Sequence, residues 1–365
     1  MRIKDICSGV TDGSHNPPQG LENSDYLMLS SKNVFDDKIT FDSPRYLSQI
    51  DFEQESKRTR IKSGDVLLTI VGTVGRAAVV GENMPQFTLQ RSVAVLHPNV
   101  EICDSRYLMY ALQANRNHIE SRAKGVAQKG IYLKEVADIE LQIPLLSEQT
   151  HRVKVLDKIA FVIKFHQKQL QKLDELVKAR FVELFGDPLL DDGRYCKAPL
   201  GCLAQVGSSK RIFEKEYVSE GIPFYRTKEI VELSNGNKIS TELFITPKRY
   251  NEIRNEYGVP QAGDLLISAV GTIGVIWIVD GKNDFYFKDG NLLRVANSDN
   301  FMPVYLKCLL ETLICAHKSK MSSGTAYAAL TISTLKEMSV YKVPLAEQSQ
   351  FSTFVSQVDK SKVVA

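Results

Sequence analysis

The sequence predicts an α+β protein in which two tandem, pseudo-repeated domains are joined by a long coiled-coil helix and followed by a second, short helix. Three observations lead to this fold class. Short blocks of sequence occur twice in the same order, each copy alternates between strand-like and helix-like stretches, and one central stretch has apolar residues at steps of three and four. With 365 residues, 43% of them hydrophobic, the chain is long enough for more than one core.

The repeat is clearest around a pair of glycine turns. Residues 64–75 begin Gly-Asp-Val-Leu-Leu and end Val-Gly-Thr-Val-Gly, and residues 263–274 begin Gly-Asp-Leu-Leu-Ile and end Val-Gly-Thr-Ile-Gly, an offset of 199 residues. Such a spacing gives each copy room for its own core, whereas solenoid repeats are about 20–50 residues long. Further echoes pair residues 31–34 with 227–230, 41–46 with 244–250, Gly125-x-Ala127 with Gly324-x-Ala326, and 144–149 with 344–348.

Residues 1–146 are expected to form the first mixed domain. The apolar stretches 66–71 and 77–80 flank a tight glycine connection, which predicts two strands paired as a hairpin. Residues 106–121 carry apolar side chains near a 3.6-residue spacing and predict a helix packed on that sheet. The residues expected to form structural turns are Gly64, Asp65, Gly72, Gly75, Gly263, Asp264, Gly271 and Gly274.

One long helix is expected over residues 147–186. Ser147 offers an N-cap, and neither proline nor glycine interrupts the stretch before Gly186-Asp187-Pro188. The apolar side chains alternate steps of three and four, which is typical of a coiled-coil seam, and the helix would reach about 55 Å. The predicted interface residues are Leu156, Ile159, Ile163, His166, Leu170, Leu173, Val177 and Leu184, with His166 as a polar residue that fixes the register.

A linker over residues 187–194 leads to the second mixed domain, residues 195–344. Residues 345–365 are expected to form a C-terminal helix of only about five turns. Such a helix would cover only part of the central seam. We therefore expect self-association or another subunit to cover the rest.

Composition sets few limits on function. Lysine and arginine total 46 against 43 acidic residues, a net charge of +3 that neither predicts nor excludes a nucleic-acid partner. The six cysteines form no Cys-x-x-Cys pair, so we expect reduced, mostly buried thiols and no metal site. No stretch resembles a signal peptide or a membrane span, which leads us to expect a cytoplasmic protein with no membrane partner.

The ordered set of repeated blocks resembles the specificity subunit of type I restriction-modification systems. The blocks are the Gly-Asp strand, the Gly-Thr-hydrophobic-Gly turn, the Pro-Leu-x-Glu-Gln entry and the long helix that follows it. The resemblance implies that each half is a target-recognition domain for one part of a bipartite site in double-stranded DNA, with the helices setting the spacer. It also implies two modification subunits that carry S-adenosylmethionine and a restriction subunit that uses ATP and Mg²⁺. This chain would then be non-catalytic and hold no cofactor. The short C-terminal helix departs from the family pattern.

Polar and basic loop residues are the candidates for DNA contact, because lysine and arginine bind phosphates and polar side chains read base edges. The two halves carry different residues at comparable places, so two different short sequences would be recognised. The candidates are Thr11, Ser14, His15, Lys32, Asn33, Lys124, Gln128 and Lys129 in the first half, and Ser208, Ser209, Lys210, Arg211, Arg226, Lys228, Lys318 and Lys320 in the second.

Two alternatives remain open at this point. Asn16-Pro17-Pro18-Gln19 resembles the Asn-Pro-Pro-aromatic loop of adenine methyltransferases, although the aromatic is replaced and no methyl-donor loop precedes it. The chain could also be a free-standing DNA-binding protein. A nuclease-like trio, Asp42 with Glu55 and Lys57, is more simply a charged surface segment, and neither glycine turn has the ending of a phosphate-binding loop.

Overall fold

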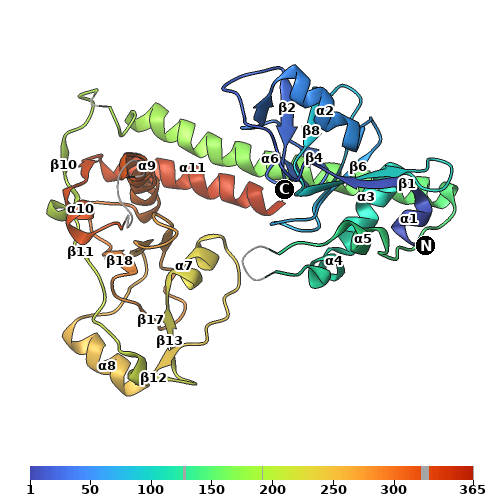
Figure 1. Ribbon diagram of the computed structural model, residues 1–365. Helices are drawn as coiled ribbons and strands as arrows, with labels where there is room; N and C mark the ends of the chain where they lie inside the picture. The colour runs from blue at the N-terminus through green and yellow to red at the C-terminus, as the bar shows by residue number, and fades with distance from the viewer. Residues whose placement is uncertain (126–128, 191, 322–328, 365) are drawn as a thin grey trace. The chain divides into compact units, whose positions relative to one another are not determined.

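The computed structural model describes residues 1–125, 129–190, 192–321 and 329–364, and Figure 1 labels its elements in chain order. The chain divides into two compact units, residues 1–164 and 165–365. The division falls within the long helix, so each unit contains one end of it. The finer five-part domain division expected above stays a prediction.

The described part of unit 1 contains two larger sheets and the two-stranded pair β3-β4. The first has the strand order β1-β9-β6-β7 with antiparallel neighbours, and the second has the order β5-β2-β8, in which β2 and β8 are parallel. The two strands around the first glycine turn are β6 and β7, and Leu67 lies opposite Ala78. The strands are β1 (Cys7–Asp12), β2 (Tyr26–Leu29), β3 (Val34–Phe35), β4 (Lys38–Ile39), β5 (Arg45–Leu47), β6 (Val66–Thr69), β7 (Ala77–Val79), β8 (Phe87–Leu89) and β9 (Val93–Pro98).

The helices of unit 1 correct one expectation. Residues 106–121 are not one helix, because the chain breaks at Asn115 between α3 and α4. The Asn115 side chain donates to the carbonyl of Ala111 (2.8 Å), which caps α3, and Arg116 then turns to donate to the carbonyl of Gly75 (3.2 Å). The helices are α1 (Ile3–Ile6), α2 (Gln49–Thr59), α3 (Ser105–Ala114), α4 (Arg116–Arg122) and α5 (Leu133–Ala137).

Unit 2 repeats the strand order of unit 1. Its sheets are β11-β18-β15-β16 and β12-β14-β13-β17, with β13 and β17 parallel, and β10 pairs with β19. The strands are β10 (Lys197–Pro199), β11 (Val206–Gly207), β12 (Tyr217–Val218), β13 (Ile222–Tyr225), β14 (Phe244–Ile245), β15 (Leu265–Ser268), β16 (Ile276–Ile278), β17 (Tyr286–Phe287), β18 (Leu292–Val295) and β19 (Ser339–Tyr341).

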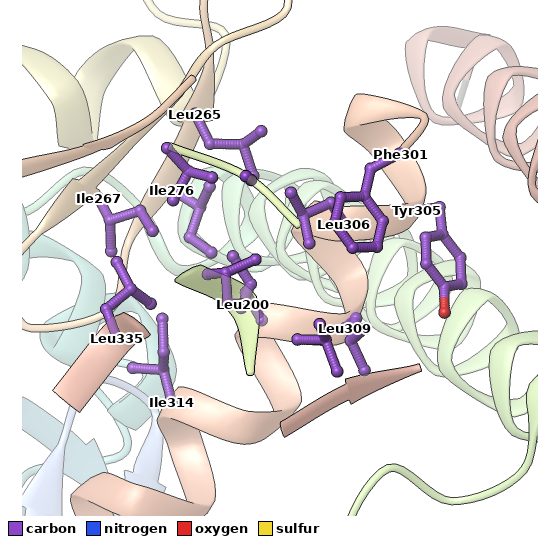
Figure 2. Packing of buried hydrophobic residues seen from close by; sticks show 14 of the residues in the cluster. Leu200, Leu265, Ile267, Ile276, Phe301, Tyr305, Leu306, Leu309, Ile314 and Leu335 are labelled. Carbon is purple, nitrogen blue, oxygen red and sulfur yellow. The ribbon is translucent and has the colours of Figure 1, made fainter. Parts of the chain in front are cut away.

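Helices cover the sheets of unit 2, and Figure 2 shows part of the largest core, where Leu265 and Ile267 of β15 lie near Leu309 and Ile314 of α9. These side chains are buried, which at about 25 cal/mol per Å² of apolar surface makes this cluster a main stabilising contribution. The helices are η1 (Leu200–Cys202), η2 (Glu214–Glu216), α7 (Thr227–Ser234), α8 (Pro247–Glu256), α9 (Pro303–Met321), α10 (Ile332–Glu337) and α11 (Leu345–Val364).

One of the repeated sequence blocks does not form the same structural element in the two units. Residues 41–46 match 244–250 in letters, but Pro44 precedes strand β5 whereas Pro247 begins helix α8. Strand pairing gives the true equivalence, because Leu27 of β2 lies opposite Tyr46 and Pro223 of β13 lies opposite Phe244. Gly125-x-Ala127 and Gly324-x-Ala326 include positions outside the described residues.

The glycine turns have nearly the same backbone in both units. Gly75 and Gly274 both have φ of +89°, a left-handed conformation that favours glycine. The aspartates that follow the first glycine of each block are buried, and each accepts a backbone N–H: Asp65 from Lys62 (2.6 Å) and Asp264 from Gln261 (2.7 Å). The repeated Gly-Asp block therefore forms a side-chain-capped turn into the central strand.

The Pro-Leu-x-Glu-Gln blocks place one buried glutamine at the start of each C-terminal helix. The Gln149 amide accepts from the N–H of Asp104 (2.8 Å) and donates to the carbonyls of Ile102 and Pro144. Gln348 does the same with Met302, Asn300 and Val343. Both side chains are 0% exposed. The long helix begins at Leu146, so Ser147 lies inside its first turn and the expected N-cap is wrong.

Helix α6 (Leu146–Phe185) is 40 residues long, and its C-terminal part pairs with α11 within unit 2 (Figure 1). Asp174 accepts from Lys362 (2.8 Å), and the ring of Phe181 lies 5.4 Å from that of Phe351. The residue numbers in these contacts rise along α6 while they fall along α11, so the two helices are antiparallel. At its other end, Val153 belongs to the core of unit 1.

The helices of the described ranges include none that is long and apolar enough to cross a bilayer. All six cysteines are free thiols, but Cys196, Cys202 and Cys315 are exposed, so the expectation of mostly buried thiols is wrong. Burial raises the pKa of Cys7 and of Cys103 to about 12, which keeps these two thiols protonated at neutral pH.

Candidate nucleic-acid interface

In each unit the first strand of the main sheet ends beside the C-terminal end of a helix. We call this place the strand–helix joint: β1 meets α2 in unit 1, and β11 meets α8 in unit 2. Register shows that the joints are equivalent, because Val10 lies opposite Leu96 and Val206 lies opposite Val295 at the same place in the two sheets. Many of the candidate DNA-contact residues lie at these joints.

The joint of unit 1 is held by a buried carboxylate. Asp12 is 5% exposed and accepts from the Arg58 guanidinium, which also donates to the Asp12 carbonyl (3.1 Å). His15 lies 2.7 Å from the second carboxylate oxygen. Because Arg58 and His15 satisfy both oxygens, the buried charge of Asp12 is compensated.

A cavity of about 330 Å³ opens beside this joint. It brings together two of the candidates, His15 and Lys124, with Arg91 and Tyr132, which no sequence pattern indicated. Lys124 is exposed and pairs with Glu135 (2.9 Å). Lys32 and Lys129 are also exposed, whereas Gln128 lies outside the described residues.

Three of the candidate residues in unit 1 have side chains or hydroxyl groups that are buried and not exposed on a loop. Ser14 is buried, and the Thr11 hydroxyl is buried with no partner in the described part of the chain. Asn33 is 3% exposed, accepts from the N–H of Ser30 (3.1 Å) and donates to the carbonyl of Asp42 (3.0 Å). Both ends of its amide are therefore used inside the protein, which corrects the expectation of a base-reading side chain.

The echoed block in unit 2 has the same internal role. Glu229 is 1% exposed and accepts from the N–H of Arg226 (2.8 Å) and from its guanidinium (3.2 Å). Arg226 thus compensates a buried carboxylate, while its side chain stays 36% exposed, so its assignment as a DNA contact stays a prediction. Lys228, on the same helix, is exposed.

The joint of unit 2 contains a pocket of about 260 Å³, which we call the β11–α8 pocket. The Lys210 ammonium lies 4.9 Å from the centre of the Tyr257 ring, and the Lys210 N–H donates to the Tyr286 hydroxyl (2.6 Å). Arg294 donates from Nε to the buried Asp264 (2.7 Å). The pocket is lined by Ser208, Ser209, Lys210, Tyr257, Gly258, Tyr286, Phe287 and Arg294.

Five of these lining residues were missed by sequence reasoning, and three of the five, Tyr257, Tyr286 and Arg294, have polar side chains. Arg294 had a usable signal, because it is a charge within the apolar strand Leu292–Val295 and such a charge needs a partner. Tyr257 and Tyr286 had none, since tyrosines occur throughout the chain. Of the remaining candidates, Arg211 is exposed and pairs with Asp289 (2.7 Å), and Lys318 and Lys320 are exposed in the last turns of α9.

The predicted seam of α6 is covered unevenly. Val177 is buried and Leu173 and Leu184 pack against the core of unit 2, but Ile159 and Ile163 are 50% and 53% exposed. Leu170 is also exposed, Leu156 and His166 are half-buried, and the His166 Nδ1 is buried without a partner among the residues described. The middle of the helix is thus the part whose apolar face stays open.

The Asn16-Pro17-Pro18 loop is tied to the sheet, because Arg45 of β5 donates to the carbonyl of Pro18 (2.6 Å). Lys57 and Glu55 lie on α2, and Asp42 uses its carbonyl for Asn33. Within the described ranges, no group of three or more histidine, cysteine or acidic side chains is placed to hold a metal ion.

Comparison with known proteins agrees with this arrangement. A family model described as the type I restriction modification DNA specificity domain matches residues 2–175 and residues 197–363. The chain is 30% identical over 265 residues to a putative type I restriction enzyme specificity subunit from Haemophilus influenzae, covering 71% of this chain and 65% of that relative. It is 23% identical over 387 residues to the putative MjaX specificity subunit from Methanocaldococcus jannaschii, covering 98% of this chain and 85% of the relative.

Solved structures show the same fold. The S subunit of a type I restriction-modification system from M. genitalium matches with a TM-score of 0.53 at 16% identity, covering 99% of this chain and 89% of that one. A chain from a structure on complex assembly and conformational transition of the type I R-M system matches with a TM-score of 0.55 at 17% identity, covering 100% and 90%. The predicted fold class is confirmed. The chain therefore belongs to the family of type I restriction-modification DNA specificity domains, with both halves matched by the family model.

Proposed function

We propose that this chain is the non-catalytic, sequence-specific DNA-recognition subunit of a type I restriction-modification complex, and that each unit reads one part of a bipartite site. One observation carries the proposal beyond family membership. The two units share strand order, capped turns and buried glutamines, yet their strand–helix joints end in different polar side chains. A common framework with different exposed ends suits two reading heads for two different half-sites.

The partners follow from the same proposal. Double-stranded DNA would be bound by both units, two modification subunits would supply S-adenosylmethionine, and a restriction subunit would supply ATP- and Mg²⁺-dependent cleavage. The open apolar face in the middle of α6, which includes Ile159 and Ile163, supports docking of a protein there, because exposed apolar patches mark interaction surfaces. A second copy of this chain is the competing occupant of that face.

The test is to express the chain with and without a modification subunit of the same restriction-modification system, and to map methylated adenines in the host DNA. We expect a complex that methylates one bipartite sequence, and no methylation by the chain alone. Methyl transfer by the isolated chain, abolished by Asn16→Ala, would support the adenine methyltransferase alternative. Specific DNA binding with no modification subunit in the complex would support a free-standing DNA-binding protein.

A further inference from the structure

We propose that the β11–α8 pocket of unit 2 binds a phosphate group of the DNA backbone, and that unit 1 has no equivalent site. This inference rests on the proposed function, because it names the chemical group of the DNA that this part of unit 2 holds. It assigns Lys210, Ser209, Tyr286 and Arg294 to one site, although they come from three separate strands and loops.

The first argument is the set of hydrogen-bond donors. The Ser209 hydroxyl is buried and has no partner in the part of the chain that the structure describes. Tyr286 accepts from the N–H of Lys210, which leaves the hydrogen of its own hydroxyl for an acceptor. Ser208 already donates to the carbonyl of Leu292 (2.8 Å), so it supplies no free donor. The pocket thus offers donors and calls for a ligand rich in acceptors.

The second argument is charge. The buried Asp264 compensates Arg294 through Nε, whereas the Lys210 ammonium rests on the Tyr257 ring, which is not an anion. The pocket therefore keeps a positive charge. A phosphate is acceptor-only and anionic, and a lysine with hydroxyl donors is a usual set of partners for it.

The third argument separates a phosphate from a base edge. Arg294 is mostly buried and is bonded to Asp264, and Ser209 and Tyr286 line a recess of about 260 Å³ together with the exposed Lys210. Base edges lie at the floor of a groove about 8.5 Å deep and are read by side chains that project outward. Donors that lie in a recess are reached instead by groups that project from the duplex, and the phosphates are such groups.

The fourth argument is the contrast with unit 1. Asp12 occupies the place of Ser208, two residues beyond the equivalent strand pairs Val10–Leu96 and Val206–Val295. Its buried carboxylate already takes the Arg58 guanidinium, and a second anion at that place would be repelled. At this place in unit 1 the Arg58 charge is spent on Asp12, whereas in unit 2 the Lys210 charge remains open.

The experiment uses the full chain with its modification subunit and two labelled duplexes of equal length, one with the mapped target and one without it. Affinity is measured by fluorescence anisotropy over a range of KCl concentrations. Lys210→Gln should weaken binding about tenfold on both duplexes and reduce the slope of log K against log salt by about 0.9. Ser209→Ala should weaken binding severalfold on both duplexes with an unchanged melting temperature, because its hydroxyl has no protein partner. Lys282→Gln, an exposed lysine of the same unit paired with Asp280, is the matched control and should change neither quantity.

The outcomes separate this inference from the function on which it rests. If the wild-type complex binds no duplex specifically, the proposed function fails. If it binds but Lys210→Gln and Ser209→Ala keep the wild-type slope and affinity, the phosphate site is wrong and the function stands. A loss confined to the target duplex, with relaxed preference at one base pair, would make the pocket a base-reading site.

Discussion

The strand–helix joints of the two units show which parts of the repeat are framework and which are free to differ. In unit 1 the joint holds an ion pair between the buried Asp12 and the Arg58 guanidinium, and in unit 2 the same place has Ser208 beside a cationic pocket at Lys210. Behind the joints, Gln149 and Gln348 make the same three hydrogen bonds. Residues that satisfy backbone groups are therefore kept between the copies, while residues at the joint have diverged.

The largest expected effect comes from an insertion in α6, between its exposed apolar face and the part that pairs with α11. Inserting seven residues after Ile163 keeps the helical phase and adds about 10 Å, equal to about three base pairs at the B-DNA rise. This site lies before Asp174, so the pairing of α6 with α11 is left intact. We expect methylation of the natural target to be lost and a target with the same half-sites and a longer spacer to replace it. Sequencing of methylated sites checks this, and an unchanged spacer would mean that the helix serves for docking only.

A two-residue insertion at the same position is the matched control. It rotates the following stretch by about 200° relative to the preceding one at 3.6 residues per turn. Any partner that contacts both parts of the apolar face would lose its match, so co-purification of the modification subunit should fail. Normal assembly with this insertion would show that partners use only one end of α6.

The shared framework gives the next prediction. Gln348→Ala removes three buried hydrogen bonds and should lower the free energy of unfolding of unit 2 by about 3 kcal/mol, and Gln149→Ala should do the same to unit 1. Urea unfolding followed by hydrogen exchange of peptides from each unit measures the two losses separately. Gln171→Ala, an exposed glutamine of α6 that bonds only Glu175, should cost less than about 0.5 kcal/mol. Equal losses in both units from one substitution would contradict separate cores.

Substitutions at the joints sharpen the contrast directly. Asp12→Ala should destabilise unit 1 by about 2 kcal/mol, because it removes the charge-assisted hydrogen bonds from the Arg58 guanidinium, which is half exposed and can be solvated. Ser208→Ala at the equivalent place should cost only about 1 kcal/mol, the value of one neutral hydrogen bond to Leu292. Thermal unfolding of both variants measures the difference. Similar losses of stability would mean that the two joints are stabilised to the same extent by these residues.

The smallest expected effect depends on pH. Burial would raise the pKa of Asp157, but hydrogen bonds from Arg106 and Tyr110 hold it below the usual aspartate range. A lowered carboxyl pKa stabilises the fold above the unfolded-state pKa, and this contribution is lost as pH falls through the folded-state pKa. The first turn of α9 in unit 2 instead packs the Tyr305 ring 5.5 Å from Phe181, a contact without charge.

Acidification from pH 7 to below about 4 should therefore weaken the α3–α6 contact of unit 1 and spare the aromatic contact of unit 2. Asp157→Asn should remove part of this acid sensitivity and cost less than about 1 kcal/mol at pH 7, because solvent screens a pair that is partly exposed. Melting curves at both pH values test it. If unit 1 of the Asp157→Asn variant loses as much stability on acidification as the wild type does, other carboxylates cause the acid sensitivity.

Local signals were enough for the repeat, the hairpins around the glycine turns and the long helix. A left-handed turn needs glycine, a strand pair needs two short apolar stretches, and a long helix needs an absence of breakers, so each is written in neighbouring residues. The end of α3 at Asn115 and the start of α6 at Leu146 were not. The Asn115 side chain bonds the Ala111 carbonyl at the first of these ends and Gln149 bonds the Pro144 carbonyl at the second, and apolar periodicity does not reveal such bonds.

Only the tertiary structure decided which polar residues face inward. Asn33 and Lys32 are neighbours in the sequence and look alike as loop residues, yet packing buries Asn33 against Ser30 and Asp42 and leaves Lys32 exposed. Lys210, Tyr286 and Arg294 form one pocket although more than eighty residues separate the first from the last. A polar side chain carries the same donors wherever it lies, and whether they are spent on the chain's own backbone or remain for DNA is fixed by long-range packing.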